Sequence, residues 1–159
     1  MKLIFRGTRD GMTNIAFHNK CDNKSETITL IKNDKGNIFG GYASISWTNP
    51  SSSTYYSAPE SFLFTLSNNY NTEPTKFPSK NDQKEVEHNS RYGPIFGGGT
   101  DLGVYKDILN KGGWSYFPYT YEDVLGKGKS IFTGDSNNNI DFKIKEIEVF
   151  KIFKWKLRI

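Results

Sequence analysis

Apolar and polar residues alternate over several short segments, which are separated by clusters of Gly, Asn, Ser and Pro. The longest alternation places one row of residues on a single face: Phe39, Gly41, Ala43, Ile45 and Trp47. A period of two predicts a β-strand with one buried face. Because Gly41 and Ala43 are small, this row predicts the close approach of another backbone or of a bulky ring.

Shorter segments with the same character predict a β-rich fold. Thr13 is expected to cap a short helix that runs to about Cys21. The apolar phase shifts after Ile144, which predicts a β-bulge near Lys145 and Glu146. Further strands are expected at 3–5, 27–31, 61–66, 84–88 and 101–105, a hairpin loop at 33–37, and irregular loops at 49–57, 68–82 and 106–128.

The simplest architecture for these elements is a mainly β (α+β) fold, a two-sheet antiparallel sandwich with a few short helices. The chain has 159 residues, the size of one domain, and no segment has the composition of an interdomain linker. Hydrophobic residues make up 35% of the chain and aromatic residues 15%. Aromatic rings are therefore expected to supply much of the core.

Composition also limits the compartment and the partners. The lone cysteine, Cys21, has no intramolecular disulfide partner, and no apolar run reaches signal-peptide or membrane-span length. These features predict a soluble protein of a reducing, cytoplasmic compartment. The net charge is +4, but most basic residues are scattered among acidic ones, so nucleic-acid binding is not expected.

The C-terminal tail, residues 153–159, is both basic and aromatic. Its alternation predicts an edge strand or a strand that pairs with a partner, in preference to a nucleic-acid or membrane patch. The alternating basic and apolar residues that carry this prediction are Lys151, Lys154, Lys156 and Arg158, and Phe153, Trp155, Leu157 and Ile159.

Several sequence patterns resemble sites for nucleotides or metals but lack required residues. Gly128-Lys129-Ser130 lacks the earlier glycine of a phosphate-binding loop, since that position holds Asp123. The acidic and amide residues at 135–146 mimic a calcium loop, but Ile140 stands where the sharp turn needs Gly. No nucleotide, metal or other cofactor is therefore expected.

One possible reactive group is Cys21, which His18 could activate from three residues earlier along the helix. A zinc site at His18, Cys21 and Asp22 is not expected, because the chain has only two His and one Cys. A half-buried structural thiol is the favoured interpretation of Cys21.

Two further segments each allow two interpretations. Three consecutive glycines at 97–99 predict either a tight crossing between sheets, which is favoured, or an exposed loop that docks a partner or an anion. An aromatic stretch could stack on sugar rings, or could simply cover the core, which is again favoured. Its residues are Trp114, Tyr116, Tyr119 and Tyr121.

Several blocks together resemble the TLDc domain family, over about residues 3–152. The blocks occur in the family's order, whereas residues 51–57 and 106–128 match only loosely. They are Phe5–Gly11, Phe17–Lys24, Asn37–Tyr42, Tyr92–Pro94, Phe96–Gly99 with Asp101, and Phe142–Val149.

The resemblance implies a two-sheet β-sandwich, a link to oxidative-stress resistance and binding to the peripheral sector of the vacuolar proton-pumping ATPase. It brings no catalytic residues. Asp10 is expected to cap the helix that follows it, and Glu148 to satisfy buried backbone donors. The positions matching the family's blocks, and so the candidates for partner contact, are Arg9, Asp10, Gly97, Gly98, Gly99, Asp101, Glu146 and Glu148.

The sequence departs from the family where helical segments usually precede the first strand, which leaves the packing of one sheet face open. The predicted function is a non-catalytic, monomeric protein-interaction domain that binds vacuolar ATPase subunits and reaches organelle membranes through them. Two alternatives are a sandwich that binds carbohydrate or another small ligand, and a weak redox role through Cys21.

Overall fold

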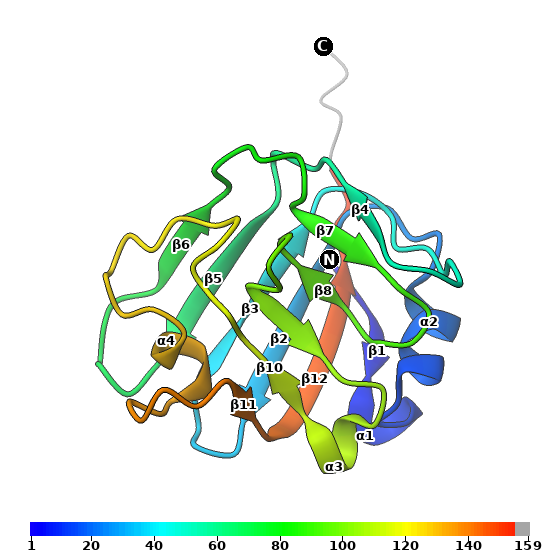
Figure 1. Cartoon of the computed structure of the whole chain (residues 1–159). Coiled ribbons are helices and arrows are strands. Elements are labelled where there is room, and N and C mark those ends of the chain that lie inside the picture. Colours follow the sequence, from blue (N-terminus) through cyan, green and yellow to red (C-terminus); the bar gives the residue numbers. More distant parts are fainter. Residues whose placement is uncertain (155–159) are drawn as a thin grey trace.

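The computed structural model describes residues 1–154. It confirms the predicted fold, two antiparallel sheets packed face to face with short helices around them (Figure 1). The first sheet has the strand order β1-β12-β2-β3-β5-β6, and the second β11-β10-β9-β8-β7-β4.

The longer strands belong to the first sheet, and the second sheet is built from strands of two or three residues. The strands of the first sheet are β1 (Lys2–Arg6), β2 (Thr27–Asn33), β3 (Ile38–Ala43), β5 (Phe62–Ser67), β6 (Thr75–Pro78) and β12 (Ile144–Lys151). The strands of the second sheet are β4 (Thr54–Tyr56), β7 (Val86–His88), β8 (Ile95–Phe96), β9 (Leu102–Val104), β10 (Gly113–Trp114) and β11 (Asp141–Phe142). The helices are α1 (Gly7–Asp10), α2 (Asn14–Cys21), α3 (Ile108–Lys111) and α4 (Ser130–Thr133).

The predicted inward row on β3 is buried, and a bulky ring does approach it. A Cβ built on Gly41 would lie 2.6 Å from Cζ of Phe96, a residue of the opposite sheet. The strand itself ends at Ala43, earlier than predicted, because the next residue, Ser44, donates its N–H to the Ser61 hydroxyl at 3.0 Å. Trp47 is nevertheless buried, with its ring 5.5 Å from that of Phe96.

Aromatic rings do supply much of the core between the sheets. Phe17 packs edge-on against Trp47 at 5.5 Å, and Phe39 meets Phe142 from the second sheet at 5.3 Å. Such edge-to-face pairs add about 0.5–1.5 kcal/mol each beyond the area that they bury. The Phe39–Phe142 contact thus joins the two sheets, and the Phe17–Trp47 contact packs α2 against the core.

Three local predictions are confirmed. The Thr13 hydroxyl accepts the N–H of Ala16 at 3.2 Å and caps α2. The β12–β2 register shifts between Ile144 and Glu146, which is the predicted bulge. The β2–β3 loop closes on Asn33, whose amide oxygen accepts two backbone N–H groups within that loop.

The loop predictions are wrong at several places. Residues 49–57 contain β4, residues 68–82 contain β6, and residues 106–128 contain α3 and β10. Strand pairing determines the conformation of β4 and β6. Strand β4 pairs with β7 and β6 pairs with β5, so their strand conformation depends on residues elsewhere in the chain.

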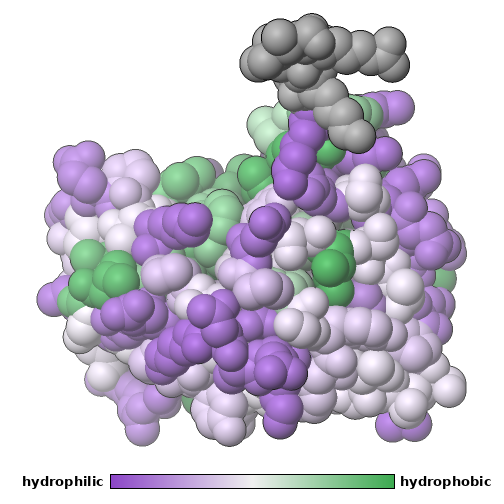
Figure 2. Space-filling model, turned by 90° about the horizontal axis from the view of Figure 1, so that it is seen from above, coloured by the Kyte–Doolittle hydropathy of each residue, from purple (hydrophilic) through white to green (hydrophobic). Residues whose placement is uncertain are grey.

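Strand β12, which lies between β1 and β2, ends at Lys151, and Ile152, Phe153 and Lys154 are not in a strand. Lys154 instead pairs with Glu26 at 2.6 Å. The rest of the predicted tail strand, residues 155–159, lies outside the described residues. Within residues 1–154, the helices are too short and too polar to cross a bilayer. The end of the sandwich viewed in Figure 2 is mainly hydrophilic, with hydrophobic residues in isolated places.

Candidate functional site

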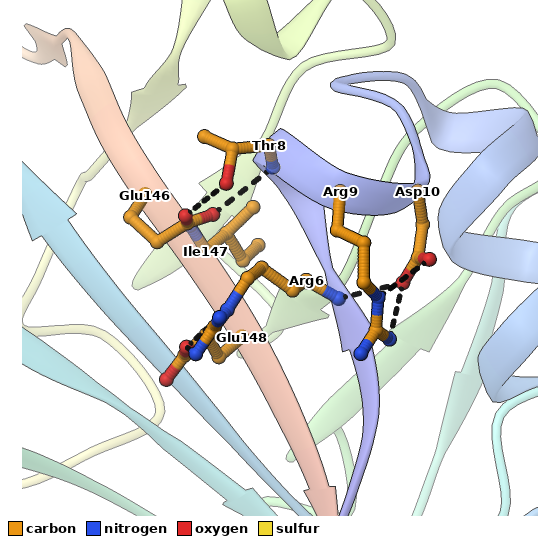
Figure 3. Close-up of polar contacts among 7 residues, drawn as sticks. All are labelled: Arg6, Thr8, Arg9, Asp10, Glu146, Ile147 and Glu148. Atoms are coloured by element: carbon orange, nitrogen blue, oxygen red, sulfur yellow. Dashed lines mark hydrogen bonds and ion pairs between the residues drawn. The ribbon is translucent and has the colours of Figure 1, made fainter.

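Charged and polar side chains gather where β1 runs into α1 beside β12 (Figure 3). Figure 3 shows them on one side of the two strands and the helical turn. We call this group the arginine–carboxylate cluster: Arg6, Thr8, Arg9, Asp10, Glu146 and Glu148.

Glu146 completes the N-terminus of α1. Its carboxylate accepts the backbone N–H of Thr8 at 3.2 Å and the Thr8 hydroxyl, and also the N–H of Ile147 at 3.0 Å. The first N–H groups of a helix have no partner within the helix. The helix's own N-cap residue, Arg6, supplies no side-chain bond, so a carboxylate from β12 takes this role.

Glu148 pairs with Arg6, which lies directly across the β1–β12 ladder. The Arg6 Nε–H donates to Glu148 Oε1 at 2.7 Å. The prediction that Glu148 satisfies buried backbone donors is therefore wrong, and it is Glu146 that accepts backbone N–H groups, from Thr8 and Ile147. Glu148 is two residues further along β12 than Glu146, and its carboxylate is bound by the Arg6 guanidinium. The Arg6 side chain remains 45% exposed.

Asp10 does not cap the helix that follows it, contrary to prediction, because Thr13 occupies that position. Asp10 is the last residue of α1, and its carboxylate turns back to accept the N–H of Arg6 at 2.9 Å. It also accepts Nε and Nη2 of Arg9 at 2.9 and 2.8 Å. The Arg9 hydrogen bonds, aided by the Arg6 N–H, hold the pKa of Asp10 well below its usual value.

The four other predicted positions lie in the loop between β8 and β9 of the second sheet, around a buried carboxylate. Asp101 is fully buried, and its two oxygens accept three consecutive backbone N–H groups. The donors are Tyr119 at 2.7 Å, Thr120 at 2.9 Å and Tyr121 at 3.1 Å. Burial raises the pKa of Asp101, and these three N–H groups oppose that effect by stabilising the ionised form.

The glycines before Asp101 leave room for this arrangement. Gly97 has φ +91°, and a Cβ there would lie 1.9 Å from Oδ1 of Asp101. Gly98 donates its N–H to the Thr120 hydroxyl at 2.8 Å, and Gly99 lies against the ring of Tyr119. Gly97–Gly99 are therefore structural, as favoured, but the predicted crossing between sheets is wrong, because they join β8 to β9 within one sheet.

The structure thus brings four of the eight predicted positions into one cluster. The other four lie where Asp101 and Gly98 hydrogen-bond the loop at residues 119–121. Sequence reasoning missed Arg6 and Thr8, which supply the partners of Glu148 and Glu146. A signal existed, because Glu146 and Glu148 are two apart on a strand and share a face, where carboxylates need donors.

A family model described as the TLDc domain matches residues 1–153. The chain belongs to the TLDc domain family. This family is associated with oxidative-stress resistance, and its domain is of the protein-interaction type. No curated protein sequence matches the chain.

Cys21 of this TLDc domain is poorly placed for thiol chemistry. Its side chain is fully buried, and burial raises the pKa of the thiol far above its usual value. A reactive cysteine needs an accessible thiolate. His18 faces elsewhere, with Nδ1 2.8 Å from Asp22 and Nε2 2.9 Å from the Tyr92 carbonyl oxygen. Residues 1–154 contain no group of His, Cys, Asp or Glu side chains that could hold a metal.

The aromatic stretch of this TLDc domain does not form one exposed platform. Tyr121 is fully buried, and its hydroxyl donates to the Glu85 carbonyl oxygen at 2.6 Å. Trp114 stacks on Tyr105 at 4.5 Å, whereas Tyr116 and Tyr119 are largely exposed. Part of the stretch covers the core, as favoured, which leaves two rings for contact with a sugar.

Proposed function

We propose that this TLDc domain is a non-catalytic protein-interaction domain. Its proposed partner is the peripheral sector of the vacuolar proton-pumping ATPase, through which it contributes to oxidative-stress resistance. The observation that carries this proposal is the family match, which covers residues 1–153. The proposed location is the cytoplasm, with recruitment to organelle membranes through the pump, and the proposed free state is a monomer.

The arginine–carboxylate cluster is the proposed contact surface. Arg9 donates hydrogen bonds from Nε and Nη2 to the Asp10 carboxylate, yet its side chain is 51% exposed. A guanidinium carries five N–H donors in a planar fork, so Arg9 keeps donors that face solvent. The Arg6 guanidinium likewise binds a carboxylate, that of Glu148, while its side chain remains 45% exposed. Two fixed, half-exposed guanidinium groups suit carboxylates on a partner protein.

The environment of the reactive residue types supports a non-catalytic role. General acid–base catalysis needs a group that can reach a substrate proton. Within the described residues, the cluster carboxylates are bonded to N–H, O–H or guanidinium groups, His18 is bonded at both ring nitrogens, and Cys21 is buried.

The test is a pull-down from cell lysate with the folded domain, followed by mass spectrometry for the peripheral pump subunits. Arg9→Glu places a carboxylate where the partner is expected to present one, so enrichment should fall sharply. Arg91→Glu is the matched control, because Arg91 is an exposed arginine outside the cluster. Circular dichroism establishes that both variants are folded.

Enrichment of pump subunits by wild type and Arg91→Glu, with loss in Arg9→Glu, supports both the partner and the surface. Equal loss in both variants contradicts the cluster as the contact surface. Absence of pump subunits from the wild-type sample contradicts the partner. Asp101→Ala is unsuitable for this experiment, because Asp101 is buried and its loss acts through stability.

A further inference from the structure

A groove of about 730 Å³ opens where the loop between β7 and β8 meets the start of α2 and the segment that leads into α3. It is lined by residues 14–15, 90–92, 105–107 and 111. Figure 1 shows α3 at the end of the sandwich where α1 also lies. We call this hollow the α2–α3 groove.

Hydrogen bonds between the three wall segments fix the shape of the groove. Asn14 joins all three, because its N–H donates to the Lys106 carbonyl oxygen at 3.0 Å and its Nδ2 to that of Ser90 at 2.7 Å. Nε2 of His18 lies 2.9 Å from the Tyr92 carbonyl oxygen and anchors the β7–β8 loop to α2. Walls that are already ordered reduce the entropic cost of binding a ligand.

One side of the groove is apolar and consists of two tyrosine rings and an isoleucine. The rings of Tyr92 and Tyr105 lie 5.4 and 4.5 Å from the ring of Trp114, which supports both of them. The Ile15 side chain lines the same groove and is 68% exposed. Supported rings beside an exposed aliphatic side chain can bury an apolar side chain of a ligand.

The charged groups of the groove are mainly basic. Arg91, Lys106 and Lys111 line it and are exposed, and within residues 1–154 the ion pairs include none of them. Asp107 is the one acidic residue among the described lining residues. Its carboxylate already accepts the N–H of Asn110 at 3.2 Å and Nδ2 of the same residue at 2.9 Å. The excess of positive charge favours an anionic ligand.

The groove continues into a second hollow, which favours a length of peptide chain over a compact small molecule. The second hollow has a volume of about 510 Å³, and Tyr105 and Lys111 line both. A peptide ligand also agrees with a domain of the protein-interaction type. The remaining charged residues of the second hollow balance one another, so the preference for acid belongs to the α2–α3 groove; they are Lys35, Lys143, Asp34 and Asp141.

We propose that the α2–α3 groove binds an acidic peptide segment of a partner protein. Carboxylates of the segment meet the three cations of the groove, and one apolar side chain packs on the two tyrosine rings and Ile15. This binding goes beyond the proposed function, because it uses no residue of the arginine–carboxylate cluster and does not require the proton pump.

The probe is a synthetic peptide of about eight residues, up to about 26 Å long when extended, with a central leucine and glutamates on both sides. One control peptide has lysine in place of glutamate, and another has alanine in place of leucine. Affinities for the whole chain are measured by fluorescence anisotropy. The acidic peptide should bind at least roughly tenfold more tightly than the lysine peptide and roughly fivefold more tightly than the alanine peptide.

Variants of exposed residues locate the binding. The double variant Lys106→Glu with Lys111→Glu should weaken the acidic peptide at least roughly tenfold and strengthen the lysine peptide. Lys20→Glu with Lys24→Glu is the matched control, because it changes the net charge equally at two exposed lysines outside the groove, and it should leave both affinities nearly unchanged. Ile15→Ser should weaken the acidic peptide roughly threefold while the chain stays folded.

Equal affinity for the acidic and lysine peptides, or no binding of the acidic peptide to the folded chain, overturns the proposal. So does an equal loss of affinity in the two double variants, since the net charge alone then explains the binding. Tighter binding of a short single-stranded oligonucleotide, or of vesicles containing phosphatidylserine, that is lost in Lys106→Glu with Lys111→Glu would overturn the assignment of the groove to a peptide.

Two arginine variants separate this proposal from the proposed function. Arg91→Glu removes a cation of the α2–α3 groove, so it should weaken the acidic peptide but retain enrichment of pump subunits. Arg9→Glu changes the arginine–carboxylate cluster, so it should lose the pump subunits but bind the acidic peptide as wild type does. Either proposal can therefore fail while the other holds.

Discussion

Replacing Asp101 by Asn tests whether the glycine segment serves to hold a buried carboxylate. Three backbone N–H groups donate to the two oxygens of Asp101. Asn keeps one oxygen and turns an NH2 group toward donors, so at least one buried N–H loses its acceptor. Hydrogen bonds to charged groups contribute about 1.5–3 kcal/mol, and an unpaired buried donor costs about 1–3 kcal/mol.

Part of this loss is offset, because burial already opposes the charge and raises the pKa of Asp101. The net cost expected for Asp101→Asn is about 2 kcal/mol, a large part of the usual 5–15 kcal/mol of folding free energy. In urea, with a slope of about 2 kcal/mol/M, the unfolding midpoint should fall by about 1 M. Tryptophan fluorescence and circular dichroism both report the transition.

Asp82→Asn is the control, since Asp82 is exposed and accepts the hydroxyl of Thr120 at 2.7 Å in the same region. Its midpoint should change by less than half as much. If Asp101→Asn unfolds at the same urea concentration as Asp82→Asn, the role assigned to the buried carboxylate is refuted.

Three further outcomes are expected. Burial lowers the pKa of His88 to about 4, so the unfolded chain binds a proton near pH 6.5 that the folded chain does not bind. Acidification from pH 6.5 to 4 should therefore lower Tm, and His88→Gln should flatten that pH dependence. Gly41→Ala forces a methyl group against the Phe96 ring and should cost about 1–3 kcal/mol in urea unfolding. Thr13→Ala removes the α2 cap and should cost about 1 kcal/mol by the same assay, whereas an unchanged midpoint would contradict the capping role.

The features predicted correctly from the sequence are those with a local cause. Thr13 caps α2 because its hydroxyl reaches an N–H three residues later, and the bulge in β12 follows from a phase shift within a few residues. The strands β4 and β6 were missed because each pairs with a strand elsewhere in the chain. The segments that contain them, 49–57 and 68–82, are rich in Ser, Asn and Pro and favour loops when considered alone.

The candidate site was found in part for the same reason. The family blocks pointed to Arg9, Asp10, Glu146 and Glu148, but not to how these residues are used. Glu146 and its partner Thr8 are 138 residues apart, so only the β1–β12 pairing brings them together. Asp101 and its donors are 18–20 residues apart, and the intervening loop has no periodic pattern that predicts its path.

The position of β12 between β1 and β2 has a consequence for synthesis of the chain. During translation β1 emerges first, but its only strand partner within the described residues is β12, which is made last. Until then, β1 has an unpaired backbone and β2 an open edge, both of which can pair with other chains. The first sheet can therefore form only after β12 has been synthesised, and folding is slow relative to a fold with local contacts. Truncation before residue 144 would leave a nascent chain prone to aggregation, and chaperone binding to β1 and β2 would be the means of protecting it.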